Sequence, residues 1–328
     1  MKIILLIVSL GIFSFVLTYL IRRYALQNKI VSIPNERSLH VVPTPHGGGL
    51  AIVISWYVGL SILYFFSKID KDLYFALLSG VILTLVSLID DLRGLKPFIR
   101  LIFHFITAII AFALLGGLRQ LVIPGLEFDY RFLIYPFAVT GMVWFINLFN
   151  FMDGVDGFAS LQAIFICLVM FFLSGSIVNV LLIACISGFL YWNWPRAKIF
   201  MGDVGSTQLG FILVVLGIYF HNIYSLSILN WIMLSSPFWF DATLTLYRRW
   251  RNGENLSQAH RKHAYQRIVQ YGFSHMKVNL WLLFINLFVI VMILIYREIK
   301  FLQAPLFLLT LLFFYIITKQ VDRRVPFK

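Results

Sequence analysis

The chain has 328 residues, of which 60% are hydrophobic, 17% are aromatic and only 12% are charged. Soluble domains carry roughly 25% charged residues, so a soluble fold of this length could not cover its surface. The same apolar composition excludes intrinsic disorder and collagen, and two cysteines, Cys167 and Cys185, are too few for a disulfide scaffold. The composition therefore indicates a membrane protein with many spans.

Apolar runs long enough to cross a bilayer recur along the whole sequence. A transmembrane helix needs about 20 apolar residues, and no repeat, low-complexity tract or linker divides the chain. We therefore predict an all-α, polytopic membrane protein with one integral membrane domain over 1–328 and a short hairpin within 117–131. The eleven predicted spans are 3–21, 47–66, 73–90, 98–116, 132–150, 158–174, 176–194, 206–222, 226–247, 278–296 and 302–318.

The basic residues are divided unevenly between the two sides that these spans define. Twenty of the 27 Lys and Arg residues fall on one side and seven on the other. Since cytoplasmic loops carry the excess of positive charge, we predict an outside N-terminus and a cytoplasmic C-terminus. The net charge of +13 is then a topology signal, and nucleic-acid binding is not needed to explain it. The cytoplasmic loops expected to form an active site are 22–46, 91–97, 150–157, 195–205 and 248–277.

Seven of the 14 acidic residues lie on or near the predicted cytoplasmic side, among them Glu36, Asp90 and Asp91. An acid near the end of a membrane span suggests a function, because burial without a partner is costly. Asp90 and Asp91 close the third span, where they repel each other and meet the negative end of the helix dipole. A bound cation would explain the pair, and so would solvated acids paired with Arg93 or Lys96.

A second acidic cluster follows the fifth span. Asn147 and Asn150 are three residues apart and therefore lie on nearly the same face of the last helical turn. Two glycines then release the backbone, so that Asp153 and Asp156 stand on a tight turn. An amide pair that reads a nucleobase, or an oxygen-rich site for a hard cation, explains this cluster better than helix capping does.

The segment Gly202-Asp203-x-Gly205-Ser206 precedes the eighth span. Ser206 fits the N-cap position, and the free amides of a helix start favour an anion nearby. Asp203 could serve only as a partner of the helix dipole. Beside a phosphate, however, it would need Mg²⁺, which prefers one or two carboxylates together with substrate phosphates.

The loop 248–277 contains two histidines among arginines and lysines. At helical spacing His260, His263 and Arg267 would share one face. Anchoring to lipid headgroups would explain the basic residues, but two histidines favour an anion-binding role. Near the first cytoplasmic loop, Gly47–Gly49 open a span and allow close approach of a ligand or of a neighbouring helix.

Taken together, these segments resemble the polyprenyl-phosphate N-acetylhexosamine-1-phosphate transferase family, with the motifs in the same order from the Pro34 loop to Arg267. Three segments look most like the branch that initiates O-antigen synthesis. They are Asn35-Glu-Arg-Ser-x-His40, Pro43-Thr-Pro-x-Gly-Gly-Gly and His260-Arg-x-His263-x-Tyr-Gln-Arg267. That branch often has arginine where this chain has His46.

The resemblance implies transfer of an N-acetylhexosamine 1-phosphate from a UDP-sugar to undecaprenyl phosphate, with release of UMP, at the cytoplasmic face of the inner membrane. It implies Asp203, with Asn150, as ligands of Mg²⁺ or Mn²⁺, and Asp156 and Phe200 as contacts of the uridine. The implied catalytic residues are Asp90, Asp91, Asp203, His260 and His263. The implied substrate-binding residues are Asn147, Asn150, Asp153, Asp156, Phe200, Arg261, Arg267, His40 and Thr44.

The expected partners are the UDP-N-acetylhexosamine donor, the undecaprenyl phosphate acceptor and membrane lipids, without nucleic acid; a homodimer is compatible with the sequence. The identity of the sugar (GlcNAc, FucNAc or QuiNAc) and the choice between one step and an aspartyl–phosphate intermediate stay open. The alternative is a transporter, which would place ionisable residues near the bilayer midplane, often in two related halves. The acids instead gather at one predicted face, and no half-repeat is visible.

Overall fold

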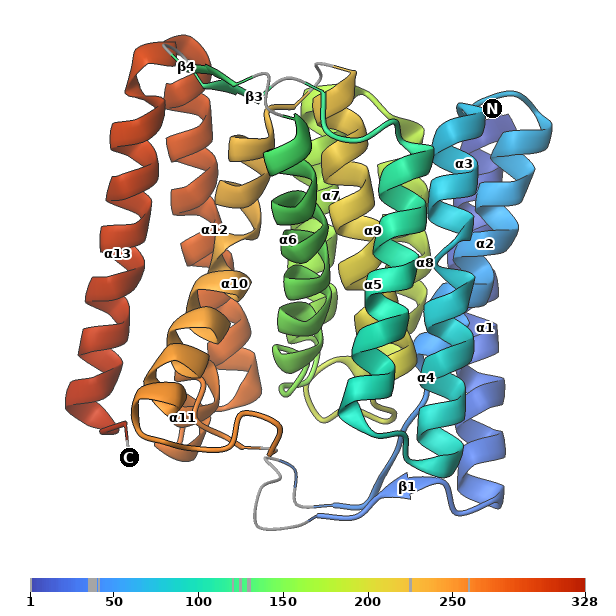
Figure 1. Cartoon of the computed structure of the whole chain (residues 1–328). Helices are drawn as coiled ribbons and strands as arrows, with labels where there is room; N and C mark the ends of the chain where they lie inside the picture. Colours follow the sequence, from blue (N-terminus) through green and yellow to red (C-terminus); the bar gives the residue numbers. More distant parts are fainter. Residues whose placement is uncertain are drawn as a thin grey trace.

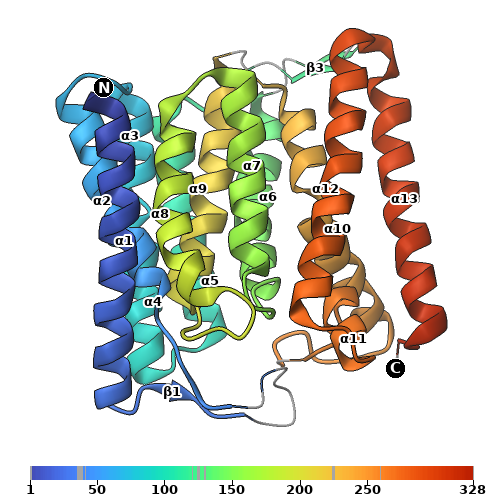
Figure 2. The ribbon, with the colours of Figure 1, turned by 180° about the vertical axis from the view of Figure 1, so that it is seen from behind.

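The computed structural model of the chain is a bundle of helices with two small hairpins (Figures 1 and 2). It describes residues 2–34, 40, 42–119, 121–123, 126–128, 131–223, 226–258 and 260–327. The helices are α1 (Lys2–Gln27), α2 (Gly49–Phe65), α3 (Lys71–Leu78), α4 (Val81–Arg93), α5 (Pro97–Leu114), α6 (Arg131–Phe151), α7 (Phe158–Ser174), α8 (Ile177–Asn193), α9 (Asp203–Asn222), α10 (Ile228–Arg251), α11 (Ala264–Gln270), α12 (His275–Glu298), η1 (Lys300–Leu302) and α13 (Gln303–Arg324).

The predicted all-α membrane fold is confirmed. Helices satisfy their own backbone hydrogen bonds, which a segment in lipid requires, and every predicted span contains helical residues. Within the described residues, seven helices are long and apolar enough to cross a membrane, namely α1, the α3–α4 pair, α5, α6, α9, α12 and α13. The apolar helices α2, α7 and α8 are shorter. The count of eleven spans and the orientation of the termini therefore stay predictions.

Both hairpins lie in loops. β3 (Leu121–Ile123) pairs antiparallel with β4 (Leu126–Phe128), which confirms the hairpin expected within 117–131. β1 (Val31–Ser32) pairs antiparallel with β2 (Thr44–Pro45) and closes the first large loop. Residues 35–39 of that loop lie outside the described residues. They include Glu36 and the part of the predicted motif from Asn35 to Ser38.

The two termini lie at opposite ends of the bundle (Figure 1). We call the lower end in Figure 1 the site end. There α1, α4, α6, α8, α10 and α13 finish and α2, α5, α7, α9 and α12 begin. The loops 22–46, 91–97, 150–157, 195–205 and 248–277 all lie at this end. Five loops that are far apart in the sequence thus meet on one face.

α9 is the central helix, and almost all of its side chains are buried. Close packing against it depends on small residues. A Cβ on Gly49 would lie 2.4 Å from the Cα of Gly205, so the start of α2 can touch the start of α9 only because both residues are glycines. The amides of Gly48 and Gly49 also donate to the carbonyls of Phe200 (2.9 Å) and Met201 (2.8 Å). These contacts fix the segment that leads into Asp203.

Candidate active site

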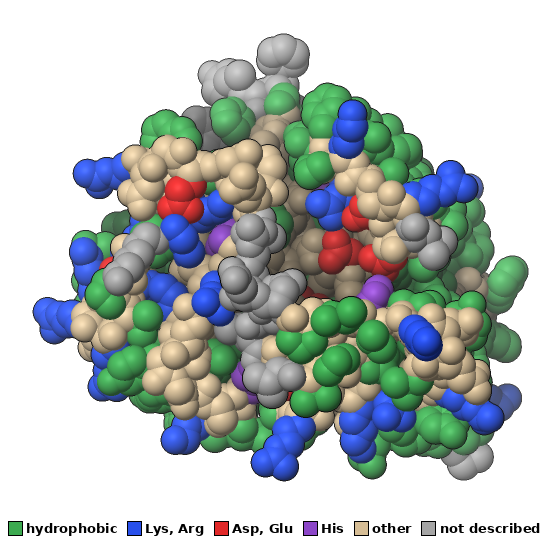
Figure 3. Space-filling view, turned by 90° about the horizontal axis from the view of Figure 1, so that it is seen from below, with side chains coloured by type: hydrophobic (Ala, Val, Ile, Leu, Met, Phe, Trp, Pro, Cys, Tyr) green, Lys and Arg blue, Asp and Glu red, His purple; other side chains and the backbone are tan. Residues whose placement is uncertain are grey.

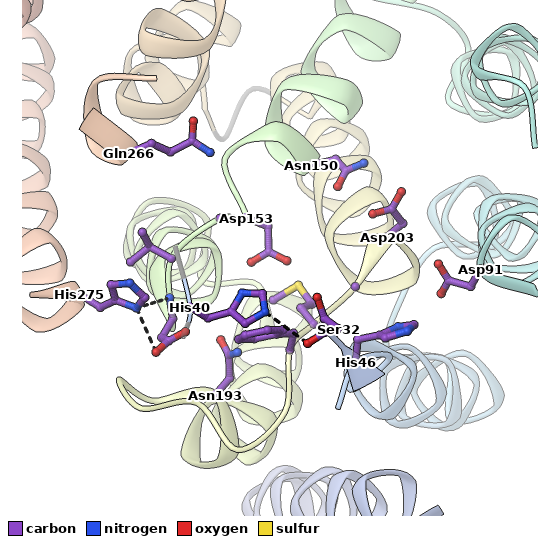
Figure 4. A pocket seen from close by; sticks show the side chains of 16 residues that line it. Ser32, His40, His46, Asp91, Asn150, Asp153, Asn193, Asp203, Gln266 and His275 are labelled. Atoms are coloured by element: carbon purple, nitrogen blue, oxygen red, sulfur yellow. Dashed lines mark hydrogen bonds and ion pairs between the residues drawn. The ribbon is translucent and has the colours of Figure 1, made fainter. Parts of the chain in front are cut away.

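A polar cavity of about 420 Å³ opens at the site end (Figure 4). Figure 3 shows this end of the molecule, where acidic side chains gather beside a hollow and Lys and Arg surround it. The cavity is lined by side chains from separate segments: Asp91 lies in the last turn of α4, Asn150 lies in the last turn of α6, and Asp203 begins α9. The structure therefore brings together acids that stand more than a hundred residues apart in the sequence.

Asp203 owes its place to the conformation of Gly202. Gly202 has φ +77°, a value that glycine adopts readily, and it is the N-cap residue of α9. The helix therefore begins at Asp203, and the expectation that Ser206 is the N-cap is wrong. The Ser206 hydroxyl instead donates to the side-chain oxygen of Asn150 (2.9 Å). This bond holds the end of α6 against the start of α9, and Asn150 and Asp203 lie side by side in Figure 4.

Asp90 and Asp91 point to different surroundings. One Asp90 oxygen accepts from the amide of Leu95 (2.6 Å), and the other pairs with the Arg100 guanidinium at 2.9 Å. The same Arg100 nitrogen lies 3.1 Å from a carboxylate oxygen of Asp203. Asp91 instead faces the polar cavity. The protein cation beside Asp90 is thus Arg100, and neither Arg93 nor Lys96 pairs with these acids.

Asp153 and Asp156 also differ in their partners. Asp153 projects into the middle of the cavity (Figure 4), where burial and the charges of Asp203 and Asp156 raise its pKa well above the usual range. Asp156 accepts from the amides of Arg196 and Ala197, both at 3.1 Å, and pairs with His275 Nδ1 at 3.0 Å. Asp156 therefore holds the 195–197 turn, whereas burial and its acidic neighbours favour a proton on Asp153.

An aromatic pair forms another wall of the polar cavity. The ring centroids of His40 and Phe200 are 4.9 Å apart at an interplanar angle of 65°, and His40 Nε2 lies 3.3 Å from the carbonyl of Ser32. The Phe200 amide donates to the carbonyl of Pro45 (2.8 Å), so the β1–β2 hairpin positions both rings. Thr44 is buried and lines an adjoining cavity of about 880 Å³, not the polar cavity itself.

A second cavity, of about 670 Å³, lies beside the polar cavity between α4, α5, α6, α9, α10 and the loop before α11. Most of its exposed wall is apolar, and we call it the apolar-walled cavity. Its polar side chains include Asn147, which donates to His104 Nδ1 (3.1 Å). The apolar residues are Val86, Pro97, Phe98, Leu101, Phe151, Leu246 and Leu256. Both cavities share Asn150, Asp153, Gly154, Asp203 and Gln266. The two spaces therefore meet at Asp203.

His260 and His263 line the apolar-walled cavity, but not in the expected manner. α11 begins at Ala264, so both residues precede the helix and the predicted helical face is absent. Burial, together with neighbouring positive charge such as that of Arg249, lowers the pKa of each imidazole to about 3. Both rings are neutral at pH 7. A neutral imidazole still has one N–H donor, so an anion-binding role of these residues stays a prediction that depends on hydrogen bonds rather than on charge.

The two expected arginines of this loop lie away from both cavities. Arg267 is buried, with a side-chain exposure of 5%, and its guanidinium pairs with Asp322 at 2.8 Å and donates to the carbonyl of Val325. Arg261 is exposed at the surface, and its carbonyl accepts from the side chain of Gln270. Neither residue lines the polar or the apolar-walled cavity.

The donor set suits a hard divalent cation completed by a ligand. Within the described residues no three His, Cys, Asp or Glu side chains gather closely enough to hold a metal by themselves. Mg²⁺ instead prefers one or two carboxylates together with substrate phosphates. Asp203 offers a carboxylate that is 37% exposed, with the Asn150 amide beside it and the Asp153 carboxyl group nearby. Asp203 and Asn150 therefore fit such an ion.

Some residues of the site were not identified from the sequence. His275 begins α12 and pairs with Asp156, and Gln266 stands between the two cavities. Arg100 was counted only as a topology charge. A lone histidine, glutamine or arginine near a helix end carries no pattern of its own. The only signal was that all three lie in or beside loops already assigned to the site end.

Comparison with known proteins shows which proteins this chain resembles. The profile of glycosyl transferase family 4 matches residues 73–221. A probable undecaprenyl-phosphate N-acetylglucosaminyl 1-phosphate transferase of Bacillus subtilis (strain 168) is 28% identical over 274 aligned residues, covering 79% of this chain and 75% of that protein. The decaprenyl-phosphate N-acetylglucosaminephosphotransferase of Mycobacterium tuberculosis (strain ATCC 25618 / H37Rv) is 27% identical over 320 residues, covering 82% and 77%. A phospho-N-acetylmuramoyl-pentapeptide-transferase of Wolbachia pipientis wMel is 29% identical over 189 residues, covering 51% and 57%.

Proposed function

Since the chain belongs to the polyprenyl-phosphate N-acetylhexosamine-1-phosphate transferase family, we propose that it transfers N-acetylglucosamine 1-phosphate from UDP-N-acetylglucosamine to undecaprenyl phosphate. The products are UMP and the lipid-diphosphate-linked sugar that begins a cell-envelope glycan. The choice of this sugar follows the names of the similar proteins of Bacillus subtilis and Mycobacterium tuberculosis, and the choice of undecaprenyl phosphate follows the name of the Bacillus subtilis protein. The O-antigen pathway, which the motifs of the first loop favour, is one glycan that this product would start.

One observation carries the proposal: two cavities of different character meet at Asp203. The polar cavity presents carboxylates, an amide and an aromatic pair, which suit a nucleotide sugar. The neighbouring cavity also has an apolar side, formed by residues such as Val86, Phe98 and Leu101, which suits the first isoprene units of a lipid phosphate. Because Asn150, Asp153 and Asp203 line both, the reacting phosphates of donor and acceptor would meet there. A protein that binds a single ligand would not need two adjoining cavities of different polarity.

The donor lies in the polar cavity with its uracil beside Phe200 and His40. Phe200 offers a flat apolar ring, and aromatic contacts of this kind contribute about 0.5–1.5 kcal/mol beyond area burial. The 195–197 turn, held by the bonds to Asp156, borders the same space. The neutral side chain of Gln266 reaches the junction of the two cavities and can donate hydrogen bonds to sugar or phosphate oxygens.

An oxygen of the acceptor phosphate attacks the sugar-side phosphorus of the donor. A new P–O bond forms, the anhydride bond breaks, and UMP leaves with the electron pair. The second pKa of a phosphate monoester is about 6, so the attacking oxygen is already largely unprotonated at pH 7. Asp90 is held by Leu95 and Arg100, which suits orientation better than proton removal. Mg²⁺ held by Asp203 and Asn150 would neutralise charge on the diphosphate.

We place this reaction at the cytoplasmic face of the inner membrane. The excess of basic residues on the site end supports that orientation. Single cysteines introduced into 252–258 should then react with impermeant thiol reagents only from the cytoplasmic side. Labelling of intact cells from outside would overturn the orientation. The competing transporter hypothesis is less favoured, because the acids that line the polar cavity stand at the ends of helices rather than at the middle of the bundle.

The test is turnover by purified protein in detergent. The protein is supplied with undecaprenyl phosphate, Mg²⁺ and one of a panel of UDP-sugars. UMP release is measured, and the mass of the lipid product is determined by mass spectrometry. UMP release with UDP-N-acetylglucosamine and a product heavier than the acceptor by one N-acetylhexosamine phosphate are expected. Asp72→Asn, at the opposite end of the bundle, is the control that should keep full activity. Absence of a sugar-phosphate product with every donor would contradict the proposal.

A further inference from the structure

Arg100 stands where the apolar-walled cavity meets the acidic cluster. Among the described residues that line this cavity, it is the one side chain with a permanent positive charge. It does not line the polar cavity. About a third of the side chain (34%) is exposed, so a ligand in the apolar-walled cavity can reach it.

The other basic residues of this cavity cannot replace it. His260 and His263 are neutral, since burial lowers the pKa of each to about 3. His104 Nδ1 accepts a hydrogen bond from the amide of Asn147, which requires an unprotonated nitrogen. A lipid phosphate that enters from the apolar side therefore finds one fixed cation.

In the part of the chain that the structure describes, only one of the three guanidinium nitrogens of Arg100 is paired. Both ion pairs, to Asp90 at 2.9 Å and to Asp203 at 3.1 Å, involve the same terminal nitrogen. The other terminal nitrogen and Nε have no hydrogen-bond partner among the described residues. A guanidinium offers a planar pair of donors that matches two phosphate oxygens. This half of the group is available while the Asp90 contact is kept.

A phosphate dianion needs such a cation at this point. Asp153 and Asp203 line the junction of the two cavities, Asp91 lines the polar cavity beside it, and Asp90 stands behind Arg100; each of these carboxylates repels a phosphate when it is ionised. We propose that Arg100 binds the phosphate of the polyprenyl acceptor through its unpaired edge and gives up Asp203 to the metal ion. This inference rests on the proposed function, and it assigns the acceptor phosphate, rather than the donor diphosphate, to a named residue.

If Arg100 releases Asp203 when it binds the acceptor phosphate, replacing Arg100 should affect the acceptor and the metal ion in opposite ways. Without Arg100 the acceptor loses its charged partner and binds more weakly. Asp203 loses a competing cation and binds a divalent ion more tightly. A residue that merely supports the fold would weaken both, and a residue of the donor site would alter the KM for the UDP-sugar.

The variants are Arg100→Gln, which removes the charge, and Arg100→Lys, which keeps the charge but loses the planar donor pair. Lys96→Gln is the matched control, because Lys96 is an exposed base of the same turn without an ion pair among the described residues. In Arg100→Gln the KM for undecaprenyl phosphate should rise roughly 10- to 150-fold, as expected for loss of a charged hydrogen bond. The KM for the UDP-sugar should stay within about threefold. The lysine variant should show a smaller rise for the acceptor only.

Binding is measured without turnover as well. Undecaprenyl phosphate should raise the Tm of the wild type more than undecaprenol does, and this difference should vanish in Arg100→Gln. Mn²⁺, titrated by electron paramagnetic resonance without substrates, should bind Arg100→Gln more tightly than the wild type. An unchanged difference between the two lipids, or Mn²⁺ binding that is equal or weaker in the variant, would overturn the exchange.

These readouts separate the two proposals. A wild type that prefers undecaprenyl phosphate to undecaprenol through Arg100, yet releases no UMP with any UDP-sugar, would refute the proposed reaction and support the phosphate site. Turnover with equal increases of both KM values in Arg100→Gln would support the reaction and refute the site. If Arg100→Gln does not fold, Arg100→Lys decides: a KM increase confined to the acceptor supports the site, and unchanged acceptor affinity overturns it.

Discussion

Two arginine–carboxylate clusters stand at the same end of the molecule, and they are built differently. Arg100 is 34% exposed, shares one nitrogen between Asp90 and Asp203, and leaves half of its donors unpaired beside a cavity. Arg267 is 5% exposed, pairs with Asp322, and donates to the carbonyl of Val325. The Arg100 cluster can exchange partners with a ligand, and we call it the open cluster. In the Arg267 cluster the protein itself supplies the partners, and we call it the closed cluster.

The closed cluster joins α13 to the loop that carries the histidines. Asp322 also accepts two bonds from Arg248 of α10, each at 3.0 Å. The ring of Phe327 lies 5.4 Å from the Arg267 guanidinium and 5.8 Å from Lys262 Nζ. These contacts hold α10, α11 and α13 together behind His260 and His263. Residues of the same type therefore serve ligand binding in one cluster and cohesion in the other, and burial separates the two roles.

The strongest way to break the open cluster is Asp203→Asn. The amide keeps the shape of the side chain but loses the charge that a divalent cation requires, so turnover should fall roughly a thousandfold. The Tm should stay close to that of the wild type, because Asp203 is partly exposed and its loss releases repulsion from neighbouring acids. UMP release and a thermal melt in detergent measure both. Full activity of the variant, or wild-type activity in excess EDTA, would contradict the metal role.

The closed cluster should respond in the opposite manner to Asp322→Asn. The change leaves Arg267 buried without its anion, which costs about 3–5 kcal/mol for a buried pair; the partial exposure of Asp322 favours the lower end. The Tm should therefore fall, while the KM for each substrate in the folded fraction stays unchanged. Thermal melts and steady-state kinetics at a temperature below the transition test this. An altered KM with an unchanged Tm would mean that the cluster serves the ligand after all.

The titration of the buried His263 should make the stability of the folded protein depend on pH. Its pKa is about 3 in the folded protein and about 6.5 when unfolded, so the unfolded state binds more protons between these values. Stability contributed by the neutral ring is complete above pH 6.5 and is lost as the pH falls, by about 1.4 kcal/mol per pH unit. Melts from pH 7 to pH 4 should show a smaller decline in His263→Gln. An identical decline in the variant would show that the ring titrates normally.

The smallest expected effect concerns Phe200 in the polar cavity, where we place the UDP-sugar. Phe200→Leu keeps an apolar side chain but removes the ring that packs against His40. The aromatic contribution of about 0.5–1.5 kcal/mol predicts a 2- to 12-fold rise in the KM for the UDP-sugar. The KM for undecaprenyl phosphate should not change, since Phe200 lines the polar cavity and does not line the apolar-walled cavity. A rise in the acceptor KM instead would reverse the assignment of the two cavities.

The sequence by itself determined the helical membrane fold and which segments carry the chemistry. Apolar runs have to form helices in lipid because their backbone groups find no other partner. Acids such as Asp90, Asp153 and Asp203 were recognised because each stands at the end of such a run, and the ends of spans lie at the membrane faces. The sequence therefore placed them at one end without any knowledge of how the helices pack.

Only the tertiary structure decided what each of these residues contacts. The sequence expected Arg267 and the two histidines on one anion-binding face, but the packing of α13 directs Arg267 toward Asp322. It counted Arg100 as a topology charge, and the approach of α4, α5 and α9 made it the partner of Asp90 and Asp203. Pairings of this kind join residues as far as 103 positions apart, and they depend on which helix faces meet. A local pattern of residues contains no record of that choice, because long, flexible charged side chains can satisfy their charge with any partner the packing brings near.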